Sequence, residues 1–238
     1  MNHAGMRWIA GLAACMVSVS AVAATLQVSP IQISISADGK AGVVRLQNQS
    51  DAPSLVQIEA LAWNETDDLS QVPRTSEILA VPPVFEIAAG AEQVIRLALR
   101  RPLTSDTEQA YRLLITEVPR TVGDGFQGVS FALRLNLPVF VTPEGALPQP
   151  AWSLEHGADG AKLTLGNQGN AHVRVRSIAL FEDGGTQPVF VSDEGGYVLA
   201  GQERSWQLDL SRLKAGASLT VKAETDLGKL EAPVDIRG

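Results

Sequence analysis

The chain has 238 residues, of which 45% are hydrophobic and 19% charged, so it holds enough apolar material for one large or two ordinary globular domains and is not a disordered chain. Its formal net charge of −7 has the wrong sign for a protein that binds the phosphate backbone of nucleic acids. With a single cysteine, Cys15, and three histidines, the chain has too few ligands for a disulfide framework or a cysteine-ligated metal site.

Residues 1–24 have the pattern of a secretory signal peptide. One basic residue, Arg7, precedes a largely apolar run from Trp8 to Val22, and small residues follow the run. The run of about 15 residues is shorter than the ~20 that cross a bilayer as a helix. A lipoprotein signal ending at Cys15 is the alternative, but the apolar run continues past that cysteine. We therefore predict a cleaved signal and an exported chain without a membrane span.

From residue 26 onward, short runs of alternating apolar and polar residues are broken by turn residues, and no long window keeps helical spacing. This pattern is typical of β-strands. The expected strands are Leu26–Ser36, Gly42–Gln47, Leu55–Trp63, Gln93–Arg100, Tyr111–Val118, Val129–Val141, Lys162–Leu165, Val173–Phe181, Ser205–Leu210, Ser218–Glu224 and Leu230–Ile236. The chain is therefore predicted to be all β.

A domain boundary is expected where prolines cluster. Three prolines and a glycine fall within Pro143–Pro150, a composition that the interior of a sheet does not tolerate. We place a linker at 144–150, between an N-terminal domain at 25–143 and a C-terminal domain at 151–238.

The two predicted domains share a weak internal repeat. The segment Leu46–Ala52 resembles Leu165–Ala171 in sequence and in its place after a short strand. Later, Ala89-Gly90 and Ala200-Gly201 are each separated by six residues from a Leu-x-Leu sequence. Two matches in the same order predict two sandwiches with the same strand order, that is, two immunoglobulin-like domains in tandem.

The sequence carries none of the usual catalytic signatures. It lacks a nucleophile elbow, a dinucleotide-binding glycine loop, a Walker sequence and a zinc-protease helix motif. Asp67-Asp68 lies in a polar segment between predicted strands, so a solvated role is favoured. His156 beside a turn and His172 at the start of a strand are interpreted as ordinary exposed or edge residues. We expect the protein not to be an enzyme.

The segment Val129–Val141 is the most two-faced strand of the chain. Its odd positions are all apolar, whereas most even positions are small or polar. From periodicity alone, the odd face is expected to be buried in the core of the first domain. However, the segment is longer than the usual strand of about 5–6 residues and contains Pro138, which belongs on an edge strand. These features support a second interpretation, an edge that pairs with another chain.

Several segments resemble the periplasmic PapD-like chaperones of the chaperone–usher pathway, which assemble pili and fimbriae. The likeness runs from residue 26 to the C-terminus. The segments are Val28-Ser29-Pro30, Leu79–Phe85 with its double proline, Val94–Leu97, Tyr111–Pro119 and, as in the branch associated with spore-coat-protein-U-type and archaic pili, Leu137–Pro143 and Tyr197–Gly201 followed by Trp206.

The resemblance implies two immunoglobulin-like domains in a boomerang arrangement, whose cleft binds an incomplete pilus subunit in the periplasm. By donor-strand complementation, the last strand of the first domain is lent to the groove of the subunit, which an outer-membrane usher then receives. No nucleotide, metal or other cofactor is needed. The side chains that this implies as donated are Val129, Phe131, Leu133, Leu135 and Leu137. The alternative function is a secreted fimbrial subunit or spacer module with immunoglobulin-like domains.

One departure from the family pattern concerns the anchor for the terminal carboxylate of the subunit. In the better-known branch, an arginine in the first strand and a lysine in the last supply it, and Gln32 and Pro138 stand at these positions here. A glutamine side chain forms hydrogen bonds but carries no charge, and a proline side chain neither forms hydrogen bonds nor carries a charge. We therefore nominate Gln32 together with Arg112 and Arg134, and Arg96 behind them, as candidate anchors; solvated sheet surface is the alternative for each arginine.

Overall fold

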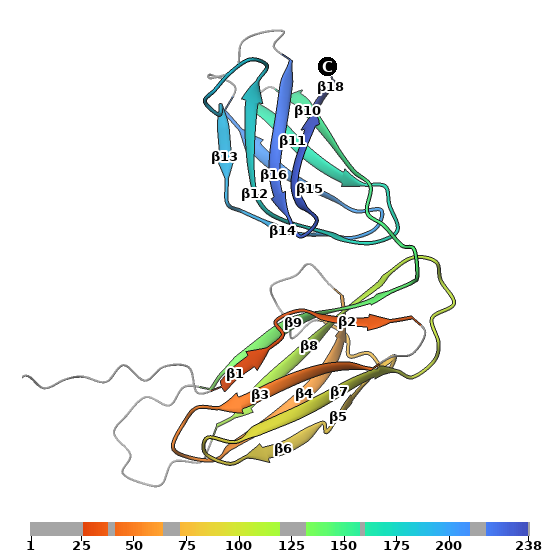
Figure 1. Ribbon diagram of the computed structural model, residues 1–238, viewed down its shortest axis with the longest axis vertical. Coiled ribbons are helices and arrows are strands. Elements are labelled where there is room, and N and C mark those ends of the chain that lie inside the picture. Colours follow the sequence, from red (N-terminus) through yellow and green to blue (C-terminus); the bar gives the residue numbers. More distant parts are fainter. Residues whose placement is uncertain are drawn as a thin grey trace, which may run out of the picture.

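The computed structural model describes residues 26–37, 41–63, 72–119, 132–157, 160–209 and 218–237. All regular structure in these ranges is β-strand, arranged as two sandwiches that follow each other along the chain (Figure 1). The predicted fold class, two immunoglobulin-like β-sandwich domains in tandem, is confirmed. The described residues form no helix of the length and apolarity that a membrane crossing requires.

The first sandwich packs a four-stranded sheet against a five-stranded one, and alternate residues of both bury a common core. Its strands are β1 (Leu26–Ser29), β2 (Ile33–Ser36), β3 (Gly42–Asn48), β4 (Ser54–Ala62), β5 (Ile78–Val81), β6 (Val84–Ile87), β7 (Glu92–Leu99), β8 (Gln109–Val118) and β9 (Arg134–Thr142). The smaller sheet has the order β1-β3-β7-β5, and the larger has the order β2-β9-β8-β4-β6.

The first predicted strand, Leu26–Ser36, is wrong as a single element. β1 pairs antiparallel with β3 in one sheet, whereas β2 pairs in parallel with β9 in the other. The chain changes sheet between them, just after the cis peptide bond Ser29–Pro30. Alternation of apolar residues continues across this change, so the sequence pattern does not reveal it. A second cis bond, Val81–Pro82, stands where β5 turns into β6.

The second sandwich has a core that contains two tryptophans, Trp152 and Trp206, whose ring centroids are 5.7 Å apart. Its strands are β10 (Pro150–Gly157), β11 (Gly160–Asn167), β12 (Val173–Glu182), β13 (Phe190–Ser192), β14 (Gly196–Val198), β15 (Glu203–Leu208), β16 (Leu219–Thr225), β17 (Gly228–Pro233) and β18 (Asp235–Arg237). One sheet has the order β15-β11-β10-β18, and the other has β13-β12-β16-β17 with β14 beside β12. The strands β5, β6, β10, β13 and β14 were not expected from the sequence.

The weak repeat of the sequence marks one structural device used twice. Asn48 ends β3 and Asn167 ends β11, and both side chains are buried. The side-chain Nδ2 of Asn48 donates to the Ala52 and Ile87 carbonyls at 2.8 and 3.0 Å. That of Asn167 donates to the equivalent carbonyls, Ala171 and Val198, at 2.7 and 3.0 Å.

The glycines of the repeat complete this device. Gly90 and Gly201 have φ of 70° and 72°, in the left-handed region that favours glycine. The carbonyl of the following residue then accepts the backbone N–H of Asn48 in the first domain, at 2.9 Å, and of Asn167 in the second, at 3.0 Å. The matching contacts show that the two domains share this corner of the fold.

Replacement of Asn167 by alanine is expected to destabilise the second domain by roughly 2–4 kcal/mol, because it removes several buried hydrogen bonds at about 1 kcal/mol each and leaves carbonyls unsatisfied. Urea unfolding followed by tryptophan fluorescence, to which Trp152 and Trp206 of this domain contribute, measures this change. The control is Gln168→Ala, an exposed neighbour, which should change the free energy of unfolding by less than about 0.5 kcal/mol. Equal effects of the two substitutions would contradict the structural role of Asn167.

Candidate functional site

Strand β9 has two neighbouring strands over only half of its length. β8 runs antiparallel beside it from Arg134 to Val141, whereas β2 pairs only with Val139–Thr142. On the β2 side of Arg134–Pro138, the described residues provide no neighbouring strand. The backbone groups that point to this side form an open edge, which is where another chain is able to add a strand. Pro138 ends this open stretch, in keeping with the restriction of proline to edge strands.

Three leucines alternate along this edge on the side facing the first core. Leu137 is buried, whereas Leu133 and Leu135 are half-buried and pack against the core from its margin. Burial within the first domain, expected from periodicity, is therefore confirmed but incomplete. Val129 and Phe131, the other two predicted donor residues, lie outside the described residues.

Arg112 lies in the middle of the opposite face of this sheet. It stands between Leu61 on β4 and Pro138 on β9. Its guanidinium carbon is 4.4 Å from the centroid of the Trp63 ring, a cation–π contact. Beside it, Leu61 packs with Val72 and Leu114 in a small buried apolar cluster. In such surroundings a cation interacts more strongly with an approaching anion than it does in water.

The other two candidate arginines lie farther from Arg112. Arg134 is exposed and stands opposite Thr116 on the same face, four residues along β8, or about 13 Å away at ~3.3 Å per residue. Arg96 is exposed on β7, in the other sheet, between Val43 and Val81. The structure thus places Arg112 and Arg134 on one face, and it separates Arg96 from them by the hydrophobic core.

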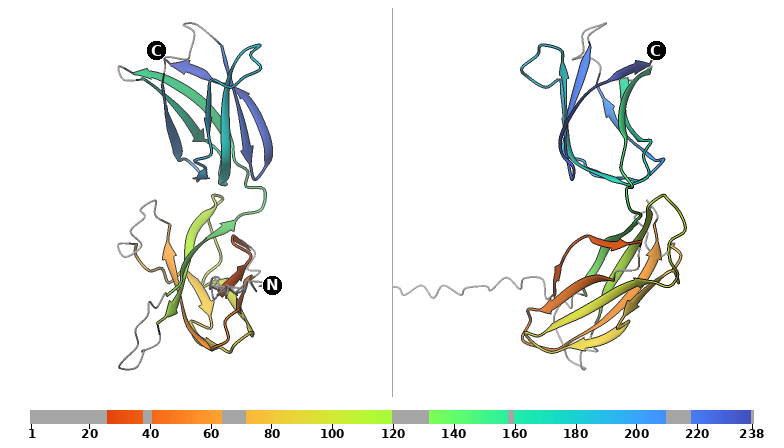
Figure 2. Two further views of the ribbon diagram at one scale, coloured as in Figure 1. Left: turned by 90° about the vertical axis from the view of Figure 1, so that its left-hand side faces the viewer. Right: turned by 45° about the vertical axis from the view of Figure 1, so that its right-hand side comes forward.

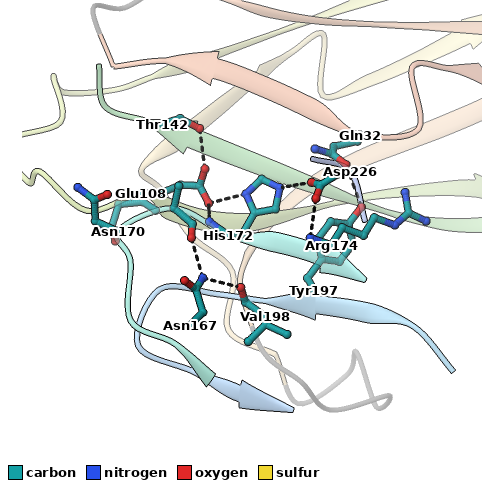
Figure 3. Close-up of polar contacts among 12 residues, drawn as sticks. Gln32, Glu108, Thr142, Asn167, Asn170, His172, Arg174, Tyr197, Val198 and Asp226 are labelled. Atoms are coloured by element: carbon teal, nitrogen blue, oxygen red, sulfur yellow. Dashed lines mark hydrogen bonds and ion pairs between the residues drawn. The ribbon is translucent and has the colours of Figure 1, made fainter. Parts of the chain in front are cut away.

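The carboxylate of Glu108 joins the two sandwiches (Figure 3). Its Oε1 accepts the backbone N–H of His172 at 3.0 Å and lies 2.6 Å from Nδ1 of the same residue, while Oε2 accepts the Thr142 hydroxyl at 2.7 Å. An ionised carboxylate only accepts hydrogen bonds, so Nδ1 of His172 carries the proton. The backbone N–H of Glu108 also donates to the Asn170 carbonyl at 2.9 Å. In the backbone, a single stretch of chain connects the two sandwiches (Figure 2).

His172 is not the ordinary exposed or edge residue that the sequence suggested. Its side chain is only 11% exposed, and its ring stacks on Phe140 with centroids 3.7 Å apart and planes at 13°. The Nε2 atom is 3.6 Å from a carboxylate oxygen of Asp226, which is beyond hydrogen-bond distance. Phe140 and Glu108 belong to the first sandwich, and Glu108 is 64 positions away from His172 in sequence. No local sequence pattern therefore reveals these contacts.

The pKa of Glu108 reflects these contacts. Burial raises the pKa of this carboxyl, but the hydrogen bonds from His172 and Thr142 and the electrostatic attraction of His172 together outweigh burial. The pKa of Glu108 therefore lies below its usual value of 4.5. The carboxylate is ionised at neutral pH, as its acceptor role requires.

Gln32, a predicted cleft anchor, also holds the two domains together. Its Oε1 accepts the Tyr197 hydroxyl at 3.0 Å, across the junction between the sandwiches (Figure 3). Burial raises the pKa of Tyr197, against the opposing effect of Arg174, so its hydroxyl remains a donor. This contact occupies the side-chain oxygen of Gln32.

Cations and aromatic rings form a continuous row across the junction. The row consists of Arg112 over Trp63, then Tyr197 edge-on to Trp63 at 5.7 Å, then Arg174 with its guanidinium carbon 5.2 Å from the Tyr197 centroid. Phe140 lies beside it, 5.2 Å from Tyr197. The row combines an apolar surface with positive charge at two points, which suits a partner that brings both apolar and anionic groups.

Sequence reasoning missed Trp63 and Glu108 as members of this site. Neither belongs to a motif, and each gains its role from residues of another strand or domain. Trp63 does end the predicted strand Leu55–Trp63, so an aromatic residue at a strand end was the one available signal. Within the described ranges, no three or more side chains of the histidine, cysteine, aspartate and glutamate types gather as metal ligands.

Comparison with known proteins identifies the family. The family described as "Pili and flagellar-assembly chaperone, PapD N-terminal domain" matches residues 25–147, more than half of the chain. The chain belongs to this PapD-like chaperone family. The probable fimbrial chaperone YadV of Escherichia coli K12 is 28% identical over 176 residues, covering 68% of this chain and 66% of the relative. Chaperone protein FimB/FhaD of Bordetella pertussis is 26% identical over 153 residues, covering 60% of this chain and 61% of the relative.

A solved structure extends the PapD-like assignment over both domains. One chain of the CsuC–CsuE chaperone–tip adhesion subunit pre-assembly complex, from the archaic chaperone–usher Csu pili of Acinetobacter baumannii, is 26% identical with a TM-score of 0.65. The match covers 90% of this chain and 100% of that one. The two curated relatives, by contrast, are matched over slightly less than two thirds of their length. The resemblance stated from the sequence is confirmed, and the archaic branch agrees with the Csu match.

Glu108 gives the stability of this PapD-like chaperone a predictable pH dependence. Because the folded-state pKa is lowered, ionised Glu108 contributes its full stabilisation above the ordinary pKa of 4.5 and loses it as pH falls through the lowered value. The free energy of unfolding of the unchanged protein should therefore exceed that of Glu108→Gln most at pH 6, and the difference should shrink toward pH 3. Urea titrations across this range measure it. For the control Glu155→Gln, at an exposed position, the difference in free energy of unfolding from the unchanged protein should stay small at every pH. A loss of stability in Glu108→Gln that does not vary with pH would refute the role assigned to the Glu108 carboxylate.

Proposed function

We propose that this PapD-like chaperone binds incomplete pilus subunits by donor-strand complementation and delivers them to an outer-membrane usher. The open edge of β9 over Arg134–Pro138 carries the proposal. Its backbone supplies hydrogen bonds to an added strand, and the apolar side chains along it fill a groove of the partner.

The donated side chains in this proposal are the odd-numbered residues from Val129 to Leu137. Half-burial of Leu133 and Leu135 supports their transfer, because side chains at the margin of a core reach a partner without opening the core. At ~1.5–3 kcal/mol per buried side chain, five of them would supply on the order of 10 kcal/mol. That is enough to stabilise a subunit that lacks part of its own core.

Arg112 is the best-placed anchor for the terminal carboxylate of the subunit. It lies in the middle of its sheet face, against Trp63, whereas Gln32 carries no charge and Arg96 is on the other sheet. Arg134 lies on the same face as Arg112 and nearer the start of the donated strand. We assign Arg112 the carboxylate itself and Arg134 a supporting charge.

The periplasm is the proposed compartment, reached with a cleaved signal peptide at residues 1–24. The domain limits proposed from the sequence, 25–143 and 151–238 around a linker at 144–150, fit the end of β9 at Thr142 and the start of β10 at Pro150. The similarity to a probable fimbrial chaperone and to a chain of a chaperone–tip adhesion subunit complex supports the role. We propose no enzymatic activity and no cofactor.

The alternative, a secreted fimbrial subunit or spacer, is less well supported by the strand content. A subunit that requires complementation lacks a strand and exposes a groove in its core. Here each sandwich has two sheets of at least four strands around a buried core. A carrier with two complete cores and an open stretch on β9 fits the chaperone role better.

Phe131→Asp combined with Leu133→Asp should abolish recovery of pilus subunits with the tagged protein from the periplasm, because charge in an apolar groove is strongly unfavourable. Affinity purification followed by mass spectrometry measures the recovery. Val191→Asp, at an exposed apolar position of the second domain, is the matched control and should leave recovery unchanged. Circular dichroism must show that the double variant is folded; undiminished recovery by a folded variant would end the donor-strand proposal.

Arg112→Gln should reduce subunit recovery more than Arg134→Gln does, because Arg112, unlike Arg134, combines a central place on this face of the sheet with a contact to an aromatic ring. Loss of a charge-assisted hydrogen bond worth about 2 kcal/mol would weaken the complex by roughly 30-fold. Competition with subunit peptides of known concentration gives the affinities. Unchanged affinity for both variants would remove these arginines as anchors.

A further inference from the structure

The second domain contains a positively charged hollow that the proposed strand exchange does not use. It has a volume of about 350 Å³ and is lined by β12, β14 and the chain before β14. The lining residues are Arg174, Val175, Arg176, Asp193, Gly195, Gly196 and Tyr197. Two arginines face one aspartate here, in a protein whose formal net charge is −7.

A β-bulge sets the position of the arginines. The pairing of β12 with β16 passes from Val175 opposite Thr225 to Ser177 opposite Glu224, which leaves Arg176 as the extra residue. A bulge of this kind redirects a side chain and interrupts the ladder. On β12, Arg174 and Arg176 flank the buried Val175, so both side chains lie on the side away from the core.

Glycine at 195 allows the chain to close against this bulge. A Cβ on Gly195 would lie only 2.3 Å from the Val175 carbonyl oxygen and 2.8 Å from that of Arg176. A side chain at this position would therefore push the segment before β14 away from the bulge. The hollow depends on the close approach of these two backbones.

A third arginine is held next to the hollow. A Cβ on Gly196 would lie 2.5 Å from Nη1 of Arg204, so the guanidinium group packs directly on the glycine backbone. The guanidinium carbon of Arg204 also lies 5.8 Å from the Trp206 ring centroid. Among the residues that the structure describes, none of the three guanidinium groups forms an ion pair with a carboxylate.

The hollow adjoins the junction between the domains through Tyr197. The Tyr197 ring lies under Arg174 and belongs to the cation–aromatic row, and its hydroxyl reaches Gln32 of the first domain (Figure 3). A partner that occupies the Arg112 face is therefore next to Arg174. Planar guanidinium groups bind carboxylates through paired hydrogen bonds.

We propose that Arg174 and Arg176 form a carboxylate-binding site, supported by Arg204, that takes an aspartate or glutamate side chain of the bound subunit. This inference rests on the proposed function for the identity of the partner, but the site itself does not. The second domain then contributes to the choice of subunit, because a subunit without an acidic residue at this place loses the contact.

The site is tested first without any subunit. The probe is acetyl-glycyl-glutamyl-glycinamide, which has one carboxylate and no charged ends, and its glutaminyl twin is the control. In amide NMR spectra of the purified protein, we expect saturable shifts of the Gly195 and Gly196 resonances with the glutamyl peptide only. Arg174→Gln with Arg176→Gln should abolish them, and Lys162→Gln, which removes an exposed charge on β11, should not. Equal shifts with both peptides, or none, would overturn the site.

The second test uses the complex with a subunit. Arg174→Gln with Arg176→Gln should weaken binding by roughly tenfold, as expected for loss of one charge-assisted contact, whereas Lys162→Gln should leave it unchanged. If the double variant binds the subunit as tightly as the unchanged protein does, the site does not take a carboxylate of the subunit, even if it binds the peptide. If the Phe131 and Leu133 substitutions have no effect while the peptide result holds, the donor-strand proposal fails and the carboxylate site remains.

Discussion

The buried carboxylate of Glu108 is the polar contact that holds the two sandwiches to each other. It is bonded at once to Thr142, at the end of β9, and to the backbone and ring of His172, at the start of β12. A buried charge with several donors is strongly stabilised in one arrangement and costly in any other. The arrangement of the sandwiches is therefore tied to the same strand whose other half is open: the end of β9 takes part in the junction, and its start is an unpaired edge.

The aromatic rings at the junction pack beside this polar contact and form a surface to which both domains contribute. Phe140 stacks on His172 from the first domain, and Tyr197 approaches Trp63 from the second. Their packing brings Arg112 and Arg174, which lie on different domains, into one row. Because dispersion and cation–π contacts fall off steeply with distance, the row exists only while the domains are held together, by the Glu108 contacts and by the hydrogen bond from Tyr197 to Gln32.

Much of the fold was predictable from local patterns, and the site only in part. Alternation predicted a strand at Val129–Val141, of which Arg134–Val141 lies in β9, and the turn residues after Asn48 and Asn167 revealed the repeat, because both patterns are short-range and tied to backbone geometry. Short strands such as β13 and β14 carry too few residues to show a period. Alternation also states which residues share a face, but not which sheet a strand joins, so Arg96 was grouped with Arg112 although a core separates them. The pairing of Glu108 with His172 spans 64 residues and leaves no local trace.

The parallel pairing of β2 with β9 has one further consequence. From Val139 onward, the backbone groups on that side of β9 are already bonded within the protein. A strand of a partner that pairs along the open edge must therefore end its pairing at Pro138, whatever its own length. The start of β2 at Ile33 thus limits the number of residues that a partner strand is able to pair with β9.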